Sequence, residues 1–286
     1  MINPEELAKH YTRFRVSERI LLTGHSHQAW PDVAFEAQQQ AWLDAAELVD
    51  DKTAAVLVSA VLYTNAHIVP NLRATLEACE RHGAELLVDA YHALNVVPFE
   101  LKKEALERAY VVGGGYKYCQ LGPGNAFLRF PADTTLRPVF TGWFSEFTDL
   151  SKAPSGRVEY GPGPARFAGA TYDFTSHYRG AAVFRFFEQQ RLTPKELGAL
   201  SQRQIDALAS ALGIETEVAL HQTGGFLALR TRHTARLHKA LKEQGVCTDY
   251  REDMLRLGPA PYVTEAQIDQ AANIIRGFTA SPRRSP

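Results

Sequence analysis

The chain has 286 residues, of which 45% are hydrophobic, and a formal net charge of −1 at pH 7. This near-neutral charge gives no reason to expect a nucleic acid or a membrane surface as partner, and the hydrophobic content is sufficient for a packed core. The three cysteines, Cys79, Cys119 and Cys247, fit no metal or disulfide spacing. Such cysteine usage is typical of the reducing cytoplasm, and no apolar run reaches the length of a membrane span.

The N-terminal stretch contains two expected helices and one extended piece. We expect a short helix over residues 4–10, an extended segment over residues 20–27 and a helix over residues 31–49. His25 and His27 alternate as in a strand and therefore share a face. Because no third ligand lies nearby in the sequence, ordinary polar contacts are favoured over a metal pair, and no metal site is predicted.

From residue 53 onward the chain alternates strands with helical segments. The hydrophobic pattern predicts four strands, at residues 54–62, 85–89, 109–113 and 125–130. A helix over 70–82 connects the first two strands, and a second crossover over 99–108 leads to the third. Strands that alternate with helical crossovers indicate an α/β fold with a mostly parallel sheet.

Two polar side chains follow neighbouring strands of this expected sheet. Asp89 ends one strand, and Lys117 follows the glycines at 113–115 at the end of the next strand. Carboxyl ends of parallel strands meet at one edge, where open α/β sheets bind ligands. Glycines there would let a ligand approach closely, and partial burial would favour a neutral, nucleophilic lysine amine. Taken singly, Asp89 could instead cap a helix and Lys117 could be a solvated loop residue.

The second half of the chain is expected to hold a long loop, a connecting helix and a small α/β domain. Residues 137–163 are rich in glycine, proline and aromatic residues and read as an ordered loop, and residues 180–190 read as a helix that joins the domains. The small domain is predicted to contain strands over 216–221 and 225–230, a helix over 234–244, short strands near Val246 and Leu255, a helix over 264–278 and a disordered tail over 281–286.

Several motifs together resemble the class V aminotransferase group of fold-type-I pyridoxal phosphate (PLP) enzymes, and within it the kynureninases. They occur in the family's order, at residues 87–98 (Leu-Val-Asp-Ala-Tyr-His and the six residues after them), 115–118 (Gly-Tyr-Lys-Tyr), 122–124 (Gly-Pro-Gly), 141–143 (Thr-Gly-Trp), 167–171 (Phe-Ala-Gly-Ala-Thr) and 255–262 (Leu-Arg-Leu-Gly-Pro-Ala-Pro-Tyr). The resemblance covers most of the chain from about Thr53, and residues 21–30 also look similar. It implies a PLP-dependent transferase-like fold with a large domain and a small C-terminal α/β domain.

The resemblance also implies site residues within one subunit. Lys117 would bind the cofactor as a Schiff base and move protons, Asp89 would support the pyridinium nitrogen, and His92 would pack near Asp89. Tyr116 would donate to the phosphate. Arg256 lies on the face opposite its two leucine neighbours and would hold the substrate α-carboxylate with its guanidinium fork, although a surface arginine is the alternative.

Other implied roles concern a shared site in a homodimer. Trp143 would line the substrate and cofactor pocket, although simple loop packing is an equal alternative. Thr171 resembles the threonine that contacts the cofactor phosphate of the neighbouring subunit, although a turn hydroxyl often binds its local backbone instead. The extended segment with His25 and His27 would contact substrate. The family therefore implies a homodimer with shared active sites.

One departure from the family lies at residues 50–53. A helix ends there and an apolar strand begins at once, where the relatives have several βαβ units that carry the stacking aromatic and the phosphate turn. The large domain is therefore expected to be internally truncated after about Lys52, with an exposed strand edge. The expected domains are an N-terminal segment over 1–52, an incomplete PLP-binding domain over 53–185 and a small C-terminal domain over 186–286.

Three functions remain open at this stage. The first is a PLP-dependent enzyme acting on an amino acid, with kynureninase-like hydrolytic cleavage of a side chain. The second is another class V reaction, either transamination or cysteine desulfurisation. Desulfurisation ranks low because Cys119 lies too close to Lys117 to reach it, and Cys247 is expected beside a small-domain strand. The third is a cofactor-free remnant that serves as a binding or structural subunit.

Overall fold

A computed structural model describes residues 3–12, 16–18, 32, 48–149, 156, 158–214 and 219–280. The chain divides into two compact units, one formed by Met1–Val56 and Pro70–Glu85 and the other by Leu57–Val69 and Leu86–Pro286. The expected segments over 20–27 and 281–286, with His25 and His27, lie outside the described residues. Of the helix expected over 31–49, only residues 32, 48 and 49 are described. The three-part domain division stays a prediction.

The first unit contains two α-helices among its described residues. Helix α1, Pro4–Ala8, begins at Asn3, whose side-chain oxygen accepts a hydrogen bond from Glu5 N at 3.0 Å. Helix α3, Leu72–Arg81, buries Leu72, Leu76, Ala78 and Cys79 along one face. The spacing of these apolar residues explains why the predicted helix over 70–82 forms.

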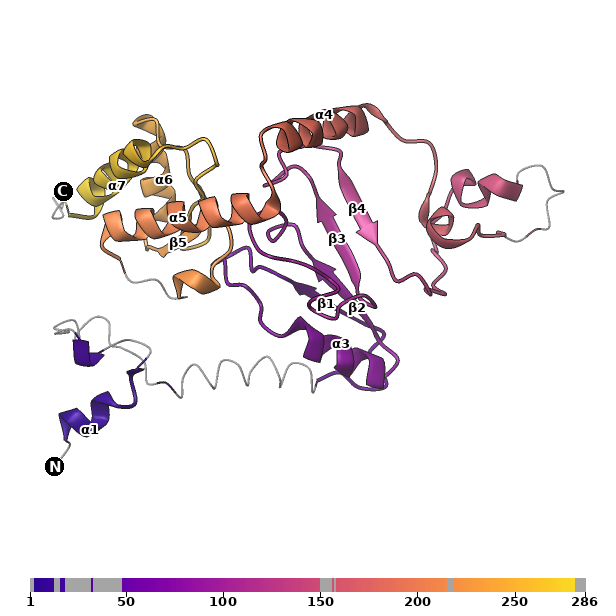
Figure 1. Ribbon diagram of the computed structural model, residues 1–286, viewed down its shortest axis with the longest axis horizontal. Coiled ribbons are helices and arrows are strands. Elements are labelled where there is room, and N and C mark those ends of the chain that lie inside the picture. The colour runs from indigo at the N-terminus through magenta and orange to yellow at the C-terminus, as the bar shows by residue number, and fades with distance from the viewer. Residues whose placement is uncertain are drawn as a thin grey trace. The chain divides into compact units, whose positions relative to one another are not determined.

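A four-stranded sheet with the strand order β1-β2-β3-β4 carries Asp89 and, in the loop after β3, Lys117 (Figure 1). Its strands are β1 (Ala55–Ser59), β2 (Glu85–Asp89), β3 (Tyr110–Gly114) and β4 (Ala126–Arg129). Strand β2 is parallel to β3, with Asp89 opposite Val112, and β4 is antiparallel to β3. In β2, Leu86 and Val88 are fully buried and alternate with half-buried residues. The predicted α/β class with a mostly parallel sheet is confirmed.

The connection between β2 and β3 differs from a regular helical crossover. Residues 99–108 form turns, with Ala105 at φ +52°, and the structure assigns no helix there. Leu106 is nevertheless fully buried and fixes this connection to the protein interior. Burial of one apolar side chain can anchor a segment without regular hydrogen bonding.

The glycines near Lys117 have a packing role that the sequence reading missed. Gly113 and Gly114 lie inside β3, so they do not simply follow the strand. A Cβ on Gly114 would lie 2.3 Å from the Tyr91 ring, and one on Gly115 would lie 2.4 Å from Leu121. Side chains of the protein therefore fill the space that was expected to admit a ligand, which is the usual reason for a glycine where another group comes close.

Two long helices follow the segment that was predicted to be a loop. That segment contains the short 3₁₀ helix η3 (Trp143–Asp149), and a second one, η4 (Gly163–Phe167), begins at its last residue. Helix α4 covers Thr175–Gln189, and helix α5 covers Pro194–Leu212. The Thr193 hydroxyl accepts a hydrogen bond from Glu196 N at 3.2 Å and so caps the N-terminus of α5.

The C-terminal part is an antiparallel sheet covered by helices. The strands β5 (Leu227–Arg230), β7 (Met254–Leu257) and β6 (Asp249–Arg251) lie in the order β5-β7-β6, with α6 (Thr234–Glu243) and α7 (Glu265–Ala280) as the later helices. Their core is closed, since Ile205, Leu227, Leu241 and Leu255 are fully buried. The strand predicted over 216–221 is wrong in its described part, because Leu220–Gln222 forms a 3₁₀ helix.

Backbone contacts fix the C-terminal sheet against the segment that follows β1. His67 and Thr223 form a β-bridge, and Ile68 N donates to Gln222 O at 2.9 Å. Gly224 N also donates to Ala66 O at 2.8 Å. These bonds bring β7 close to the edge of the four-stranded sheet where the predicted site residues lie.

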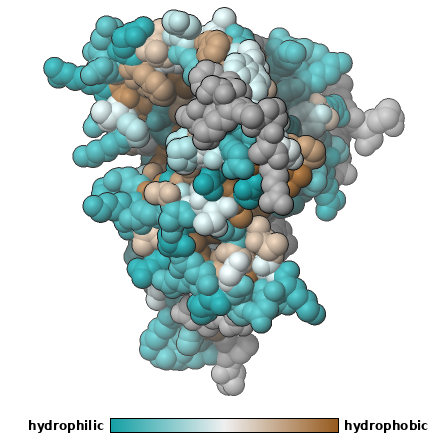
Figure 2. Space-filling view, turned by 90° about the vertical axis from the view of Figure 1, so that its right-hand side faces the viewer, coloured by the Kyte–Doolittle hydropathy of each residue, from teal (hydrophilic) through white to brown (hydrophobic). Residues whose placement is uncertain are grey.

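Hydrophobic side chains also reach the surface. Figure 2 shows brown hydrophobic patches between teal hydrophilic areas on one face. Exposed large side chains include Leu57 in β1, Phe127 and Leu128 in β4, and Tyr178 and Phe184 in α4. No helix in the described part of the chain is both long and apolar enough to cross a membrane.

Candidate active site

Lys117 is positioned by an ordered loop after β3. Gly115 N donates to Asn125 O at 2.7 Å, and Leu121 N donates to Gly115 O at 2.8 Å, so the loop closes on itself. Helix α4 holds the far side of this loop, since Arg179 Nε donates to Leu121 O at 2.6 Å. The lysine is therefore half-buried on a fixed backbone rather than on a free loop.

A cavity of about 300 Å³ lies beside Lys117. Its lining comes from both sheets and their loops, and consists of His92, Lys117, Tyr118, Phe226, Cys247, Thr248, Asp249, Arg256 and Gly258. Three residues predicted from the sequence, Lys117, His92 and Arg256, thus share one cavity although they are far apart in the chain. A cavity of this size accommodates a small ligand.

Arg256 projects into this cavity from β7 with its guanidinium fixed on two sides. Nη1 donates to the Tyr63 carbonyl oxygen at 2.6 Å, and Nη2 pairs with the Asp249 carboxylate. The guanidinium carbon also lies 5.5 Å from the centroid of the Phe226 ring, a cation–π arrangement. Only 11% of the Arg256 side chain is exposed, so the alternative of a free surface arginine is wrong.

His92 lies against the same aromatic ring. Its ring centroid is 6.2 Å from that of Phe226, at an interplanar angle of 59°. Burial, together with the nearby positive charges of Lys117 and Arg256, lowers the pKa of His92 to about 4, although Asp89 acts in the opposite direction. His92 is therefore a neutral imidazole near pH 7.

Tyr118 is half-buried and forms part of the cavity wall. Burial raises the pKa of Tyr118 to about 12, against a smaller opposing effect of Arg256. Its hydroxyl therefore stays protonated under ordinary conditions. Gly225, at φ +80°, makes room for this ring, because a Cβ there would lie 2.3 Å from the Tyr118 hydroxyl.

Asp89 and Tyr116 lie near the cavity without lining it. Asp89 Oδ1 accepts a hydrogen bond from Tyr91 N at 2.8 Å, and Oδ2 lies 3.5 Å from the Ser59 hydroxyl. The local bond resembles the capping role that was the alternative for this aspartate. Tyr116 is exposed, its ring centroid lies 5.6 Å from that of Tyr91, and Lys117 Nζ lies 5.0 Å from the Tyr116 centroid.

Trp143 and Thr171 contact each other instead of the cavity. Trp143 Nε1 donates to Thr171 Oγ1 at 3.3 Å, and Phe144 N donates to Gly169 O at 3.0 Å. A Cβ on Gly142 would lie 2.6 Å from Gly169 O. The two motifs at 141–143 and 167–171 therefore pack together, and the indole remains 46% exposed.

Sequence reasoning missed several cavity residues. Phe226 follows the Gly224–Gly225 turn, and a glycine pair before an aromatic residue was the only available sign. Asp249 lies directly opposite Arg256 in the β6–β7 pairing, which the predicted strands were too imprecise to show. Cys247 was expected beside a small-domain strand and does precede β6, but the sequence did not show that this exposed residue lines the cavity together with Lys117.

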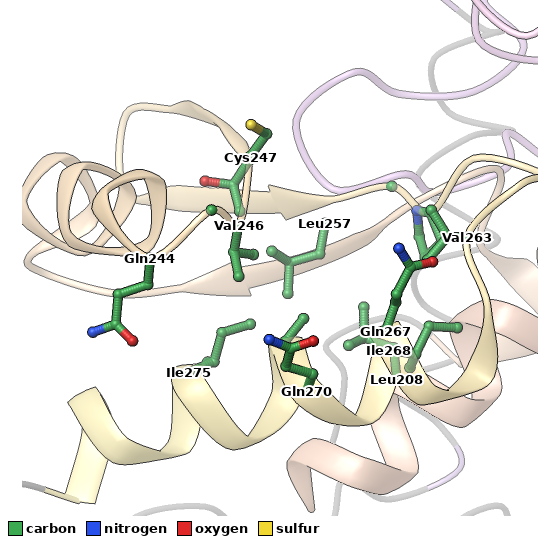
Figure 3. A pocket seen from close by; sticks show the side chains of 15 residues that line it. Leu208, Gln244, Val246, Cys247, Leu257, Val263, Gln267, Ile268, Gln270 and Ile275 are labelled. Atoms are coloured by element: carbon green, nitrogen blue, oxygen red, sulfur yellow. The ribbon is translucent and has the colours of Figure 1, made fainter.

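A second cavity of about 330 Å³ lies within the C-terminal part (Figure 3). In Figure 3 Val246 and Leu257 point toward Ile268 and Ile275 of α7, with glutamine side chains around them. Cys247, Thr248 and Gly258 line both cavities. The short segment before β6 is therefore a partition between the two spaces.

The residues in and beside the cavity offer a partner for each of three groups of pyridoxal phosphate. An amine is available for its aldehyde at Lys117, and a carboxylate for its ring nitrogen ends the adjacent parallel strand at Asp89. An exposed tyrosine hydroxyl is available beside Lys117 for a phosphate oxygen. Within the described residues, no cluster of three or more His, Cys, Asp or Glu could hold a metal ion.

Comparison with known proteins places these observations in a family context. Residues 192–275 match the model of the kynureninase C-terminal domain. Kynureninase from Burkholderia mallei (strain SAVP1) is 29% identical over 235 residues, which are 77% of this chain and 55% of that protein. Kynureninase from Bacillus anthracis is 27% identical over 249 residues, 82% of this chain and 56% of that protein. The chain thus spans little more than half the length of these relatives.

Solved structures show the same fold. Apo cysteine desulfurase from Thermococcus onnurineus NA1 matches with a TM-score of 0.66 and 15% identity, over 82% of this chain and 62% of that one. Serine palmitoyltransferase from S. paucimobilis with a bound PLP–myriocin aldimine matches with a TM-score of 0.53 and 16% identity, over 84% and 58%. The predicted resemblance to kynureninases, the fold type and PLP as the cofactor of this class are confirmed.

Proposed function

We propose that this chain is a PLP-dependent enzyme that cleaves the side chain of an amino acid hydrolytically, with kynurenine as substrate and anthranilate and alanine as products. The observation that carries the proposal is the single cavity lined by Lys117, His92 and Arg256. The resemblance to kynureninases supports the choice of reaction.

Lys117, Asp89 and Tyr116 would hold the cofactor. Lys117 would bond its aldehyde carbon, Asp89 would face its ring nitrogen and Tyr116 its phosphate. When bound, PLP supplies an electron sink for the substrate carbons next to the amino group. Backbone hydrogen bonds and the Arg179 side chain fix the lysine loop, so the Lys117 side chain starts from a defined point beside the cavity.

Arg256 would bind the substrate α-carboxylate. A guanidinium group presents five N–H donors, and two partners already fix its plane in this cavity. A fixed plane lowers the entropic cost of forming a bidentate contact. The arginine would therefore orient the substrate relative to Lys117.

Lys117 would transfer the protons of the reaction, and the side chains around it in the cavity include the neutral His92. The Lys117 amine would take and return the proton of the substrate amino-acid carbon. His92, neutral because its pKa is about 4, can accept a hydrogen bond without adding positive charge. The buried Phe226 ring and the half-buried Tyr118 ring would exclude water from that side of the cavity.

A homodimer with shared active sites would give Trp143 and Thr171 a function. Both belong to motifs that pack together outside the cavity of their own chain. The half-exposed indole would then contact the pocket of a second copy, and the Thr171 hydroxyl its cofactor phosphate. This part of the proposal rests on the family resemblance.

A second candidate reaction is desulfurisation of cysteine, and the position of Cys247 favours it. The Cys247 side chain is exposed and lines the cavity that holds Lys117. A thiol in that position would be able to take sulfur from a bound cysteine substrate. Release of alanine from cysteine that disappears in Cys247→Ser, while kynurenine cleavage persists, would separate the two reactions.

The direct test is turnover of kynurenine by the purified protein with added PLP. Anthranilate formation, followed by its fluorescence, should be abolished in Lys117→Ala. The control is Lys103→Ala, because Lys103 pairs with Glu100 on the surface at 2.6 Å and should be dispensable. If there is no turnover and the absorbance spectrum of the protein does not change when PLP is added, the cofactor-free remnant is favoured.

A further inference from the structure

Asp249 occupies an unusual place for a carboxylate in this cavity. It lies directly opposite Arg256 in the antiparallel pairing of β6 with β7, and its Oδ2 pairs with Arg256 Nη2. Its other oxygen lies 3.2 Å from Arg251 Nη1. Partial burial alone would raise the pKa of Asp249, but the hydrogen bond and charge of Arg256 outweigh burial and lower it. The residue is therefore an anion near pH 7.

The two partners of this ion pair are not equally fixed. Arg256 is 11% exposed and is also held by the Tyr63 carbonyl of a distant segment. The Asp249 side chain is 55% exposed, and its other contacts, with Tyr250 N at 2.6 Å and Arg251 Nη1 at 3.2 Å, come from its two neighbours in the chain. A competing anion would therefore displace Asp249 more easily than it would move Arg256. Exposed carboxylates lose little free energy on leaving an ion pair because water solvates them.

The segment that carries Asp249 has space on both sides. Cys247 and Thr248, which precede it, form the partition between the cavity beside Lys117 and the second cavity of about 330 Å³. The second cavity is lined mainly by apolar side chains and glutamines, as Figure 3 shows. A small shift of Cys247 and Thr248 into the second cavity would therefore meet little packed protein and would leave the Asp249 side chain room to turn from Arg256.

We propose that Asp249 is a specificity-determining residue: an internal carboxylate that occupies Arg256 and that the carboxylate of an incoming ligand must displace. This inference rests on the proposed role of Arg256 as the carboxylate-binding group. A ligand whose carboxylate cannot reach Arg256 leaves the pair of Asp249 and Arg256 intact, and Arg256 then contributes nothing to its binding. A carboxylate ligand therefore binds only if its contact with Arg256 is more favourable than the contact of Asp249 that it replaces.

A purely structural role for the same pair predicts the opposite result. Opposite charges across an antiparallel pair stabilise the sheet and orient each other. If Asp249 only orients Arg256, its removal weakens carboxylate binding. If Asp249 competes with the ligand, its removal strengthens carboxylate binding.

The experiment is a ligand-observed NMR titration of benzoate, with benzamide as the uncharged control ligand. We expect Asp249→Asn to bind benzoate about tenfold more tightly than the unaltered protein, the effect of one charge-assisted hydrogen bond, with benzamide unchanged. The matched control is Asp253→Asn, which removes a carboxylate paired with Arg230 outside the cavity and should leave benzoate binding unchanged.

The outcomes separate this inference from the proposed function. Equal or weaker benzoate binding in Asp249→Asn would overturn the competition. Asp249→Ser serves as a second variant if the first does not fold. Arg256→Ala should abolish benzoate binding whatever Asp249 does. If Arg256→Ala leaves benzoate binding intact, the carboxylate site itself is wrong and the proposed function loses its substrate anchor.

Discussion

The two sheets that supply the cavity walls are built differently. The C-terminal sheet encloses a core in which Leu227, Leu241 and Leu255 are fully buried. The four-stranded sheet instead leaves apolar side chains exposed on its outer strands in the described part of the chain, with Leu57 69% and Phe127 44% exposed. The C-terminal sheet therefore specifies its own packing, while the sheet that carries Lys117 depends on additional cover. An exposed strand edge was expected after the internal truncation.

The largest predicted effect tests this difference in packing. Leu255→Ala should lower the free energy of unfolding by about 2–5 kcal/mol, because it leaves a cavity in a closed core. Leu57→Ala, at a strand position 69% exposed, should change it by less than about 0.5 kcal/mol. Urea unfolding of both variants measures the contrast. Equal losses would mean that Leu57 is covered in solution.

The next effect concerns what the C-terminal wall contributes to binding. Arg256→Ala should weaken amino-acid ligands by about 2–3 kcal/mol, because a charged hydrogen-bonded contact is lost. Binding of PLP, which would be held by residues of the four-stranded sheet, should change much less. Separate titrations of ligand and cofactor measure the two effects. Similar losses for both would show that Arg256 has a structural role.

The contact between the two walls predicts a pH dependence of stability. His92 lies between Lys117 and Phe226, and its folded pKa of about 4 is below the unfolded value of 6.5. The unfolded chain binds more protons between these values, so the contribution is complete above about pH 6.5 and is lost as the pH falls toward 4.

At pH 5 this loss should be roughly 1–2 kcal/mol, given about 1.4 kcal/mol per pKa unit and solvent screening at a half-buried ring. His92→Asn should remove that part of the dependence in urea unfolding at pH 7.5 and pH 5. The same dependence in both proteins would mean that the two walls do not enclose His92.

The smallest effect is the difference between two glycine variants, and it tests how closely the two walls pack at one backbone position. Gly225→Ala should cost about 2 kcal/mol of stability, because the new Cβ overlaps the half-buried Tyr118 ring. Gly245→Ala is the matched control, since Gly245 has the same φ of +80° and nothing within 4 Å. The control should cost only about 1 kcal/mol of backbone strain. Thermal unfolding of the two variants gives the difference, and equal costs would contradict the contact.

The sequence predicted the regular elements better than the cavity. Strand β2 was placed at its observed bounds because its apolar alternation ends sharply at Asp89. The region around residue 220 was misread because an apolar run does not distinguish a strand from a 3₁₀ turn. Lys117 and Arg256 were found through motifs, but Tyr118, Phe226 and Asp249 depend on contacts between sequence-distant segments. Such contacts leave no periodicity in the chain.

Lys117 is the residue on which the assignment of this cavity as a PLP site most depends. The purified protein should be titrated with PLP, reduced with borohydride and digested, and the modified peptide identified by mass spectrometry. We predict visible absorbance of lysine-bound cofactor before reduction, and a modification at Lys117 that is absent from Lys117→Ala. A modification spread over surface lysines, or no uptake of PLP at all, would contradict the assignment of this cavity as a PLP site.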